Sequence, residues 1–341
     1  MSEPFTIRDG AALRALLQGL PNADGEAVSA CRAREAELTK PAGALGRLEE
    51  LTEWLCAWQG RHPPRLERVL ILVFVGWHDI ACRGVSAYPA EVTDQMVANF
   101  TAGGAAINQL AKLAGAELRV IPMAEGRPAH DFTQMPAMSE QGTLRAIQAG
   151  LDAVPEGIDL VAIGEMGIAN TTAAAAVAAG LYREPAAAWA GPGTGLDPTG
   201  VRRKAEVIEQ GLARHAAAIG DPLAVLRYLG GRDLAAMMGA VLGARLRRVP
   251  VLLDGFTATV PAAVLQALAP GSIEHCRAGH RSAEPGHRKL LDRLGLVPLL
   301  ELGMRLGEGS GAAVALNLVR AAVACHVGMA TFGEAAVSRR G

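Results

Sequence analysis

Short apolar segments recur along this chain, and each is followed by a polar or glycine-rich loop and then by a helical segment. The clearest is Val69 to Val75, a continuous run of aliphatic and β-branched residues that is typical of a strand buried on both faces. Further strand-like runs occupy residues 117–121, 158–163, 249–253, 272–276 and 297–302. Alternating strands and helices predict an α/β fold: a mostly parallel, Rossmann-like sheet with helices on both faces.

Both ends of the chain are helical in pattern and have no strand of their own. Residues 10–38 read as helical, with a polar break near residues 21–25, and a second helical pattern ends at His62-Pro63-Pro64. We therefore expect three parts. Residues 1–60 and 311–341 are helical segments that pack together as a small lobe, and residues 65–310 form the α/β catalytic domain.

Charge and cysteine content narrow the class of function. The 33 basic and 34 acidic residues leave a net charge of −1, which does not favour nucleic acid or an anionic membrane surface as a partner. The five cysteines are scattered, without metal-ligand spacing, so reduced thiols and a cytoplasmic location are the simplest interpretation. No signal peptide and no uninterrupted membrane-spanning run is expected.

Ligands of parallel sheets bind at the carboxyl ends of the strands, and the polar loops of this chain fall there. The loops after Val75, Ile163, Leu253, Cys276 and Leu302 are therefore expected to converge on one cleft. In the last of them Glu308 is a single carboxylate among glycines. It can act as a general base with a raised pKa, or it can be a first-turn helix residue favoured by the helix dipole.

Two glycine-containing loops are candidates for binding a phosphate. Residues 164–172 follow a strand and open a helix, where free N–H groups and the side chains of Asn170 and Thr171 can hold one phosphate; the alternative is an ordinary tight turn. The loop has neither dinucleotide-binding glycines nor a Walker lysine, so a mononucleotide fits better. In the second loop, residues 191–195, Lys204 can supply a charge, although alone it reads as a solvated helix lysine.

Other polar clusters are weaker signals. Ser86 and Tyr88 offer a hydroxyl and a ring at a strand-end loop, and Trp77 and His78 in the preceding turn can stack on a ligand or pack locally. The histidines and carboxylate of residues 280–287 lack the spacing of a zinc site, so we expect no metal there. Glu284, directly before Pro285, reads as a helix start.

Six motifs stand in the order found in one family. They are KPAGALGRLE (40–49), GVSAYPAEVT (84–93), GGAAIN (103–108), GEMGI (164–168), LDGF (253–256) and RLGEGSGAA (305–313). On these motifs, from about residue 38 to residue 335, the chain resembles the nicotinate-nucleotide:dimethylbenzimidazole phosphoribosyltransferase family of cobalamin lower-ligand synthesis.

The resemblance implies transfer of the phosphoribosyl group from nicotinate mononucleotide to 5,6-dimethylbenzimidazole, giving α-ribazole 5′-phosphate and nicotinate. It implies a homodimer, no metal and no dissociable cofactor. Glu308 is expected to be the general base. Residues expected around the base are Ser86, Tyr88, Trp77, His78 and Met166, and those expected around phosphate and ribose are Glu165, Gly167, Asn170, Thr171, Gly193, Thr194 and Lys204.

The chain departs from the family pattern in two loops. After the first strand, Trp77 replaces a small polar residue and Asp79 replaces a glycine, a residue type that allows positive φ. In the phosphate loop Ala169 stands where glycine is more common. These departures leave two alternatives open: a catalytically silent nucleotide-binding paralogue or partner subunit, and the same chemistry on another base, such as adenine or a phenol.

Overall fold

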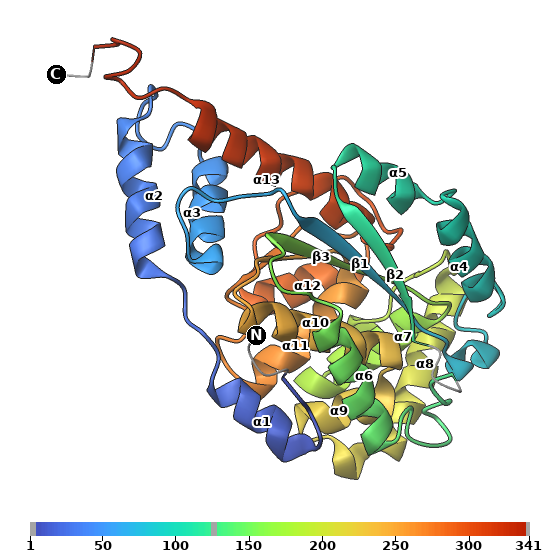
Figure 1. The fold of residues 1–341 in the computed structure, drawn as a ribbon. Helices are drawn as coiled ribbons and strands as arrows, with labels where there is room; N and C mark the ends of the chain where they lie inside the picture. Colours follow the sequence, from blue (N-terminus) through green and yellow to red (C-terminus); the bar gives the residue numbers. More distant parts are fainter. Residues whose placement is uncertain (1–4, 124–127, 339–341) are drawn as a thin grey trace.

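The computed structural model describes residues 5–123 and 128–338. Residues 1–4, 124–127 and 339–341, which belong to the predicted terminal segments and to an irregular central stretch, lie outside the described residues. Five strands form one parallel sheet, in the order β2-β1-β3-β4-β5. They are β1 (Val69–Val75), β2 (Glu117–Pro122), β3 (Leu160–Met166), β4 (Val251–Leu253) and β5 (Cys276–Ala278). The prediction of a parallel α/β sheet is confirmed (Figure 1).

Thirteen α-helices surround the sheet in the described part of the chain. They are α1 (Gly10–Gln18), α2 (Gly25–Glu37), α3 (Arg47–Gln59), α4 (Val92–Ala102), α5 (Ala106–Leu113), α6 (Glu140–Asp152), α7 (Asn170–Tyr182), α8 (Pro198–Arg214), α9 (Pro222–Leu229), α10 (Arg232–Leu246), α11 (Phe256–Leu268), α12 (Pro285–Leu294) and α13 (Ser310–Gly328). Short 3₁₀ turns are η1 (Asp79–Arg83), η2 (Ala186–Ala188) and η3 (Ala216–Ala218).

Local sequence explains where several helices begin and end. Proline occupies the first turn of α8, α9 and α12, where its missing N–H has no helical partner to lose. Left-handed glycines end α3, α4 and α12. Ser139 caps α6 by accepting a hydrogen bond from the N–H of Gly142.

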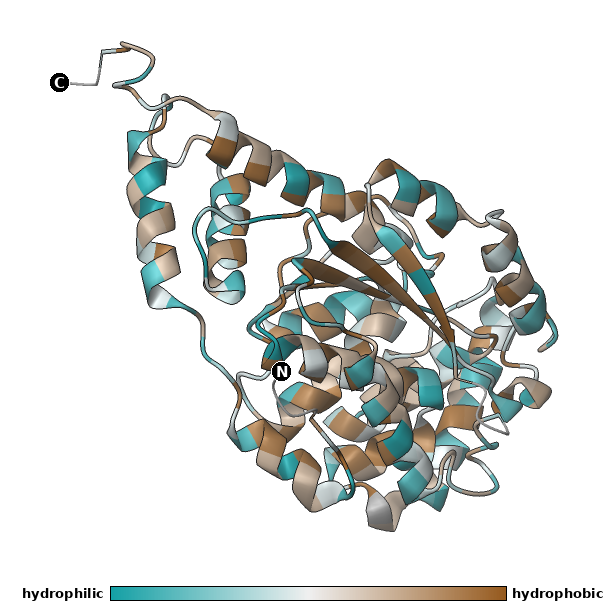
Figure 2. Ribbon diagram, in the orientation of Figure 1, coloured by the Kyte–Doolittle hydropathy of each residue, from teal (hydrophilic) through white to brown (hydrophobic). Residues whose placement is uncertain are grey.

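Alternate residues of the central strands bury opposite faces of the sheet. Leu70, Leu72 and Phe74 of β1 belong to the large core beneath α6, α7, α10 and α11, whereas Ile71 and Val73 belong to the core beneath α3, α5 and α13. Figure 2 shows the apolar strands as a brown layer between helices. Because both faces are covered, β1 reads as a continuous apolar run rather than an alternating one.

Helices α2 and α3 lie beside the C-terminal end of α13 at one side of the molecule, whereas α1 lies apart from them (Figure 1). The guanidinium of Arg34, on α2, donates to the carbonyl oxygens of His326, Val327 and Met329 at the end of α13. Leu38 forms an isolated antiparallel bridge with Thr331. These contacts join α2 to the end of α13. Helix α1 instead packs on the large core through Leu13 and Leu17. The division into a small lobe and a catalytic domain, with boundaries at residues 60, 65 and 310, stays a prediction.

Among the described helices, α13 alone is long and apolar enough, by length and composition, to cross a membrane. Its residues Ala312, Leu316 and Val319 are buried in the core that α13 forms with α3, α5 and the sheet. Core helices of soluble proteins pass the same test of length and composition, so this helix is weak evidence for a membrane.

Two local predictions are wrong. Residues 271–275 form turns, and the strand begins at Cys276, whose N–H donates to the carbonyl oxygen of Ile273. Residues 297–302 are irregular: Pro298 has no N–H, Val297 and Leu302 are 66% and 60% exposed, and only Leu300 forms a bridge, with His280.

Candidate active site

A cavity of about 650 Å³ opens at the carboxyl edge of the sheet. It lies beside the ends of β1 and β3, where the chain order reverses from β2-β1 to β3-β4, which is where doubly wound sheets bind ligands. The described lining residues are Tyr88, Val92, Met96, Glu165, Met166, Gly167, Ile168, Asn170, Thr171, Gly193, Thr194, Gly255, Phe256, Thr257, His280, Ser282, Glu284, Arg305, Leu306, Gly307 and Glu308. The predicted convergence of strand-end loops is confirmed.

Glu308 occupies the middle of a tight turn just before α13. Gly307, Glu308 and Gly309 have φ values of 80°, 62° and 77°, so the glutamate is one of few non-glycine residues in the left-handed region. Its N–H donates to the carbonyl oxygen of Glu165 at 2.9 Å. A Cβ on Gly164 would lie 2.1 Å from the nitrogen of Gly309, which explains the glycine inside β3. Glu308 is therefore outside the first turn of the helix.

Glu308 is 4% exposed as a residue, and it lines the cavity. Burial raises its pKa, the negative charge of Asp254 raises it further, and a hydrogen bond from the main chain of Ile107 opposes the rise. Its Oε2 has no hydrogen-bond partner among the described residues. An unpartnered, buried carboxylate oxygen in a cavity is suited to accept a proton from a bound ligand.

Glu165 lies on β3 next to this turn. Burial raises the pKa of its carboxyl group from the ordinary 4.5 to about 8, and the charges of Asp233, Asp254 and Glu308 add to the rise. The side-chain amide of Asn170 donates to its Oε2, which opposes the rise. The structure thus brings the predicted residues Glu165 and Asn170 together, and Asn170 is engaged by the carboxyl group.

A buried cation, Lys204, lies behind the cavity lining, next to the lining residues Thr171 and Gly193. Lys204 is fully buried, and its Nζ donates to Oγ1 of Thr171 at 2.9 Å and to the carbonyl oxygen of Gly191 at 3.1 Å. Burial lowers the pKa of its ammonium group from 10.5 to about 8, and the nearby carboxylate of Glu284 opposes that change. The alternative of a solvated helix lysine is wrong.

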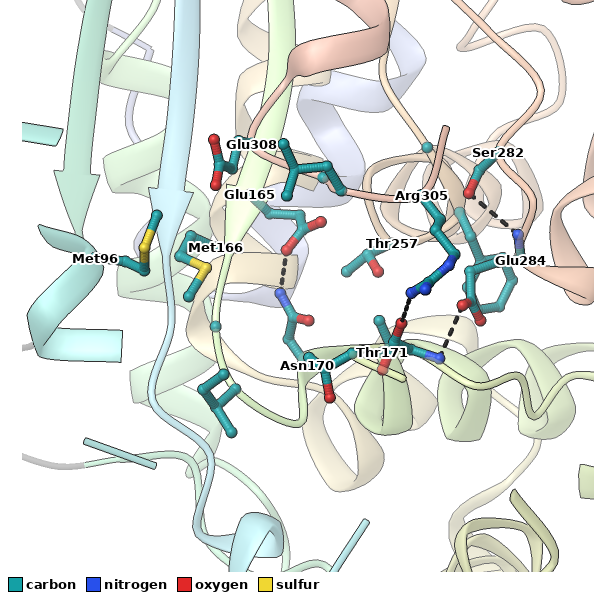
Figure 3. A pocket seen from close by; sticks show the side chains of 18 of the residues that line it. Met96, Glu165, Met166, Asn170, Thr171, Thr257, Ser282, Glu284, Arg305 and Glu308 are labelled. Atoms are coloured by element: carbon teal, nitrogen blue, oxygen red, sulfur yellow. Dashed lines mark hydrogen bonds between the residues drawn. The ribbon is translucent and has the colours of Figure 1, made fainter. Parts of the chain in front are cut away.

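The cavity residues that were not predicted as site residues include Ser282, Glu284 and Arg305. Oε1 of Glu284 accepts a hydrogen bond from the N–H of Gly193 at 2.9 Å, and Nη1 of Arg305 donates to the carbonyl oxygen of Gly193 at 2.9 Å. The Ser282 hydroxyl accepts from the N–H of Glu284. Figure 3 shows these three side chains on one side of the cavity and Glu308, Met96 and Met166 on the other. Glu284 does precede α12, but its side chain makes no capping bond there.

Apolar side chains line the end of the cavity near Glu308. Tyr88 and Met166, which were predicted around the base, line the cavity together with Val92, Met96, Ile168 and Leu306. Ser86 is set back from the lining, with its Oγ 2.9 Å from Oγ1 of Thr194. The sequence pattern that could have identified Val92 and Met96 as cavity residues is their spacing of four residues, on a helix directly after the Ser86–Tyr88 motif.

Trp77 and His78 do not line the cavity, contrary to prediction. Nε1 of Trp77 donates to Oδ1 of Asp94 on α4 at 3.0 Å. His78 is buried, with Nε2 3.1 Å from the carboxylate of Asp233 on α10. A Cβ at Gly76 would lie 2.4 Å from Cγ of Asp233. The His78–Asp233 pair therefore fills the space behind the loop that follows β1.

The two departures in loop sequence have different structural consequences. Asp79 begins η1 without a positive φ, so it adopts a conformation that any residue accepts. Ala169 has a φ of 73° and is buried at the residue preceding α7, the conformation for which glycine is suited.

Within the histidine cluster, His280 lines the cavity, whereas His287 has a structural role. His287 is neutral, because burial lowers the pKa of its imidazole to about 3. Its Nδ1 accepts from the N–H of Ser282 at 2.9 Å and its Nε2 lies 3.1 Å from Oγ1 of Thr259, so both ring nitrogens are engaged. Within residues 5–123 and 128–338, no group of three or more His, Cys, Asp or Glu side chains is arranged to hold a metal ion.

Comparisons with known proteins agree on one family. A family model described as phosphoribosyltransferase matches residues 20–337. A nicotinate-nucleotide–dimethylbenzimidazole phosphoribosyltransferase of Mesorhizobium japonicum is 57% identical, over 99% of this chain and 100% of its own. One from Cereibacter sphaeroides is 54% identical, over 99% of both chains. A crystal structure with the same enzyme name from Thermus thermophilus matches 93% of this chain and 100% of its own, at 42% identity and a TM-score of 0.85.

Proposed function

Because the chain belongs to the nicotinate-nucleotide–dimethylbenzimidazole phosphoribosyltransferase family, we propose that it transfers the phosphoribosyl group of nicotinate mononucleotide to 5,6-dimethylbenzimidazole. The products are α-ribazole 5′-phosphate and nicotinate, and the reaction belongs to the synthesis of the cobalamin lower ligand. The observation that carries the proposal is the buried, unpartnered Oε2 of Glu308 beside a cavity that is also lined by Thr171, the residue to which the buried Lys204 donates.

The donor nucleotide occupies the end of the cavity around Gly193. Lys204, the Thr171 hydroxyl and the N-terminal amides of α7 supply positive charge and donors for the 5′-phosphate. Arg305 is exposed at the rim and adds a further cation. Glu284 accepts the hydrogen bond of the Gly193 N–H, so a phosphate that binds this N–H has to displace the carboxylate.

The acceptor base occupies the apolar end. Met96, Met166 and Ile168 offer flat contact for a bicyclic aromatic ring, and Glu308 faces the ring edge. Glu165 is protonated near neutral pH, so its carboxyl group can donate a hydrogen bond to a ribose hydroxyl between the two ends.

The reaction is a displacement at the anomeric carbon of the ribose. The lone pair of one benzimidazole nitrogen forms the new bond, and the bond to nicotinate breaks with its electrons passing to the positively charged pyridine ring. Glu308 takes the proton from the other benzimidazole nitrogen, so nicotinate leaves without protonation and one proton ends on the carboxylate. Attack on the face opposite to nicotinate converts a β-nucleotide into an α-product. Orientation of the two substrates supplies much of the rate.

The remaining partner assignments rest on composition and family resemblance. We propose a cytoplasmic homodimer that binds neither nucleic acid nor membrane. The near-zero net charge supports the absence of a polyanionic partner.

A product assay tests the proposal. The purified protein is incubated with nicotinate mononucleotide and, separately, with 5,6-dimethylbenzimidazole, benzimidazole, adenine and a phenol, and products are identified by mass spectrometry. We expect α-ribazole 5′-phosphate with the first base, formed at the highest kcat/KM of the panel. Product with adenine or a phenol alone would reassign the acceptor. Calorimetric binding of the nucleotide with no product from any base would contradict the proposed activity.

A further inference from the structure

Helix α13 starts at Ser310, two residues after Glu308. Its first N–H groups, which have no partner within the helix, therefore lie beside the proposed base. A helix N-terminus carries a partial positive charge and favours negative groups near it. It therefore stabilises the ionised form of a neighbouring carboxylate and makes that carboxylate a weaker base. A general base placed before a helix needs something that offsets this effect.

The carboxylate of Asp254, directly after β4, accepts hydrogen bonds from those N–H groups. Its side chain is 1% exposed, its Oδ2 accepts from the N–H of Gly309 at 3.2 Å, and its Oδ1 accepts from the N–H of Ala312 at 3.0 Å. The N–H of Gly311 adds a further hydrogen bond. No residue at the start of α13 itself makes a side-chain cap, so a carboxylate from a distant strand caps this helix.

His280, after β5, holds Asp254 from the other side. Its Nε2 lies 3.5 Å from Oδ1 of Asp254, and both side chains are buried. A Cβ at Gly311 would lie 2.1 Å from the His280 ring, and one at Gly279 would lie 2.8 Å from Cα of Ala312. The loop after β5 is thus pressed directly against the first turn of α13, and the turn that carries Glu308 is fixed by the ends of two strands.

We propose that Asp254 is a positioning residue for the reaction: it occupies the N-terminal amides of α13, which holds the Glu308 turn in place and keeps the helix dipole from weakening Glu308 as a base. This inference rests on the proposed function. Asp254 also repels a negative charge on Glu308 directly. Both effects make Glu308 more basic.

The other titratable groups near Glu308 are few. Glu165 on β3 faces both Glu308 and Asp254, Asp233 on α10 faces Glu165, and His280 faces Asp254. Burial raises the pKa of Asp254, and its three amide donors and His280 oppose that rise. Replacing Asp254 with the neutral, similarly sized asparagine removes one charge from this group.

The test is the pH dependence of kcat/KM for phosphoribosyl transfer in Asp254→Asn. We expect the acid limb to move to lower pH by roughly half a unit, about a threefold change in the ionisation constant, with a several-fold lower plateau. The dissociation constant of nicotinate mononucleotide, measured by calorimetry, should change less than about twofold. As a matched control, Asp221→Asn alters an aspartate that caps α9 and should leave the pH profile in place.

Asp254→Glu separates charge from geometry and serves if the asparagine variant does not fold. It keeps the charge but moves the carboxylate, so the acid limb should stay within about 0.2 units of the wild type while kcat falls. An unmoved acid limb in Asp254→Asn, or a downward shift in Asp254→Glu, would overturn the inference. Absence of any transfer by the wild-type protein would instead reject the proposed function, so the two failures are distinguishable.

Discussion

The main-chain N–H of Glu308 donates to the carbonyl oxygen of Glu165 at 2.9 Å, which attaches the proposed base to the end of strand β3. The turn that carries Glu308 also lies against Gly164, where a side chain would not fit. The base is therefore held by rigid main chain, although its own φ of 62° is unfavourable for a residue with a side chain. Such strain persists only where surrounding structure enforces it.

Removing the carboxylate of Glu308 should affect the rate rather than the binding of the donor. In Glu308→Gln we expect kcat to fall by about 10²- to 10⁴-fold, because proton removal from the azole is lost. The KM for nicotinate mononucleotide should stay within a few-fold, since the variant leaves Thr171, Gly193 and the buried Lys204 beside them unchanged. Steady-state kinetics with both substrates varied measure this split.

Glu301→Gln is the matched control, because Glu301 is exposed in the segment leading to the same turn. It should retain near wild-type kcat. If Glu308→Gln and Glu301→Gln were equally active, Glu308 would not be the base.

The buried carboxyl group of Glu165 should make stability depend on pH. Its pKa is about 8 in the folded protein and near 4.5 when exposed, so the folded state binds the proton more tightly. This contribution to stability is fully present below about pH 4.5 and is lost as the pH rises through about 8. We expect Glu165→Gln, which cannot ionise, to raise Tm relative to the wild type more at pH 8.5 than at pH 5, in thermal denaturation monitored by circular dichroism.

Glu26→Gln serves as the control for this comparison, because Glu26 is exposed on α2. Its effect on Tm should differ little between the two pH values. A Tm difference between Glu165→Gln and the wild type that is independent of pH would show that Glu165 is ionised in the folded protein.

Lys204 should control affinity for the phosphate of the donor. In Lys204→Met we expect the KM for nicotinate mononucleotide to rise at least about tenfold, because a buried charge-assisted contact is lost. The pKa of about 8 adds a second expectation: in the wild type, affinity for the nucleotide weakens above that pH as the ammonium group deprotonates. Kinetics of Lys112→Met, which removes an exposed lysine, should match the wild type.

Ala169 should be a site of stored strain. Its φ of 73° is costly for alanine and free for glycine, so Ala169→Gly should raise the free energy of unfolding by roughly 0.5 to 1 kcal/mol, after the larger entropy of the unfolded glycine chain is counted. Urea denaturation measures the change. Ala176→Gly, in the buried interior of the following helix α7, should instead lower it by about 1 kcal/mol or more.

Trp77 should influence the acceptor from a distance. Its hydrogen bond to Asp94 ties the end of β1 to α4, the helix that presents Val92 and Met96 to the cavity. In Trp77→Phe we expect the KM for 5,6-dimethylbenzimidazole to rise several-fold, which corresponds to about 1 kcal/mol, with little change for the nucleotide. Asp94→Leu should have the same effect, and the double variant should be no worse than either, because both remove one interaction.

Local patterns in the sequence predicted the parallel sheet, the strand-end placement of the loops and the glycine turn around Glu308. These features depend on neighbouring residues: a buried parallel strand is a continuous apolar run, and a tight turn needs glycine. The long motifs likewise predicted the family. The same local signals failed at residues 297–302, where Pro298 has no N–H to donate and only Leu300 forms a bridge to the neighbouring segment.

By itself the sequence determined the fold class, the family and the position of a lone carboxylate in a glycine loop. Only the tertiary structure decided that Lys204 is buried, that Glu284 and Arg305 meet at Gly193, that His78 pairs with Asp233 away from the cavity, and that Asp254 caps α13 beside Glu308. Each of these joins elements far apart in the chain. Burial and charge coupling depend on which elements pack together, and no local pattern of residues contains that information.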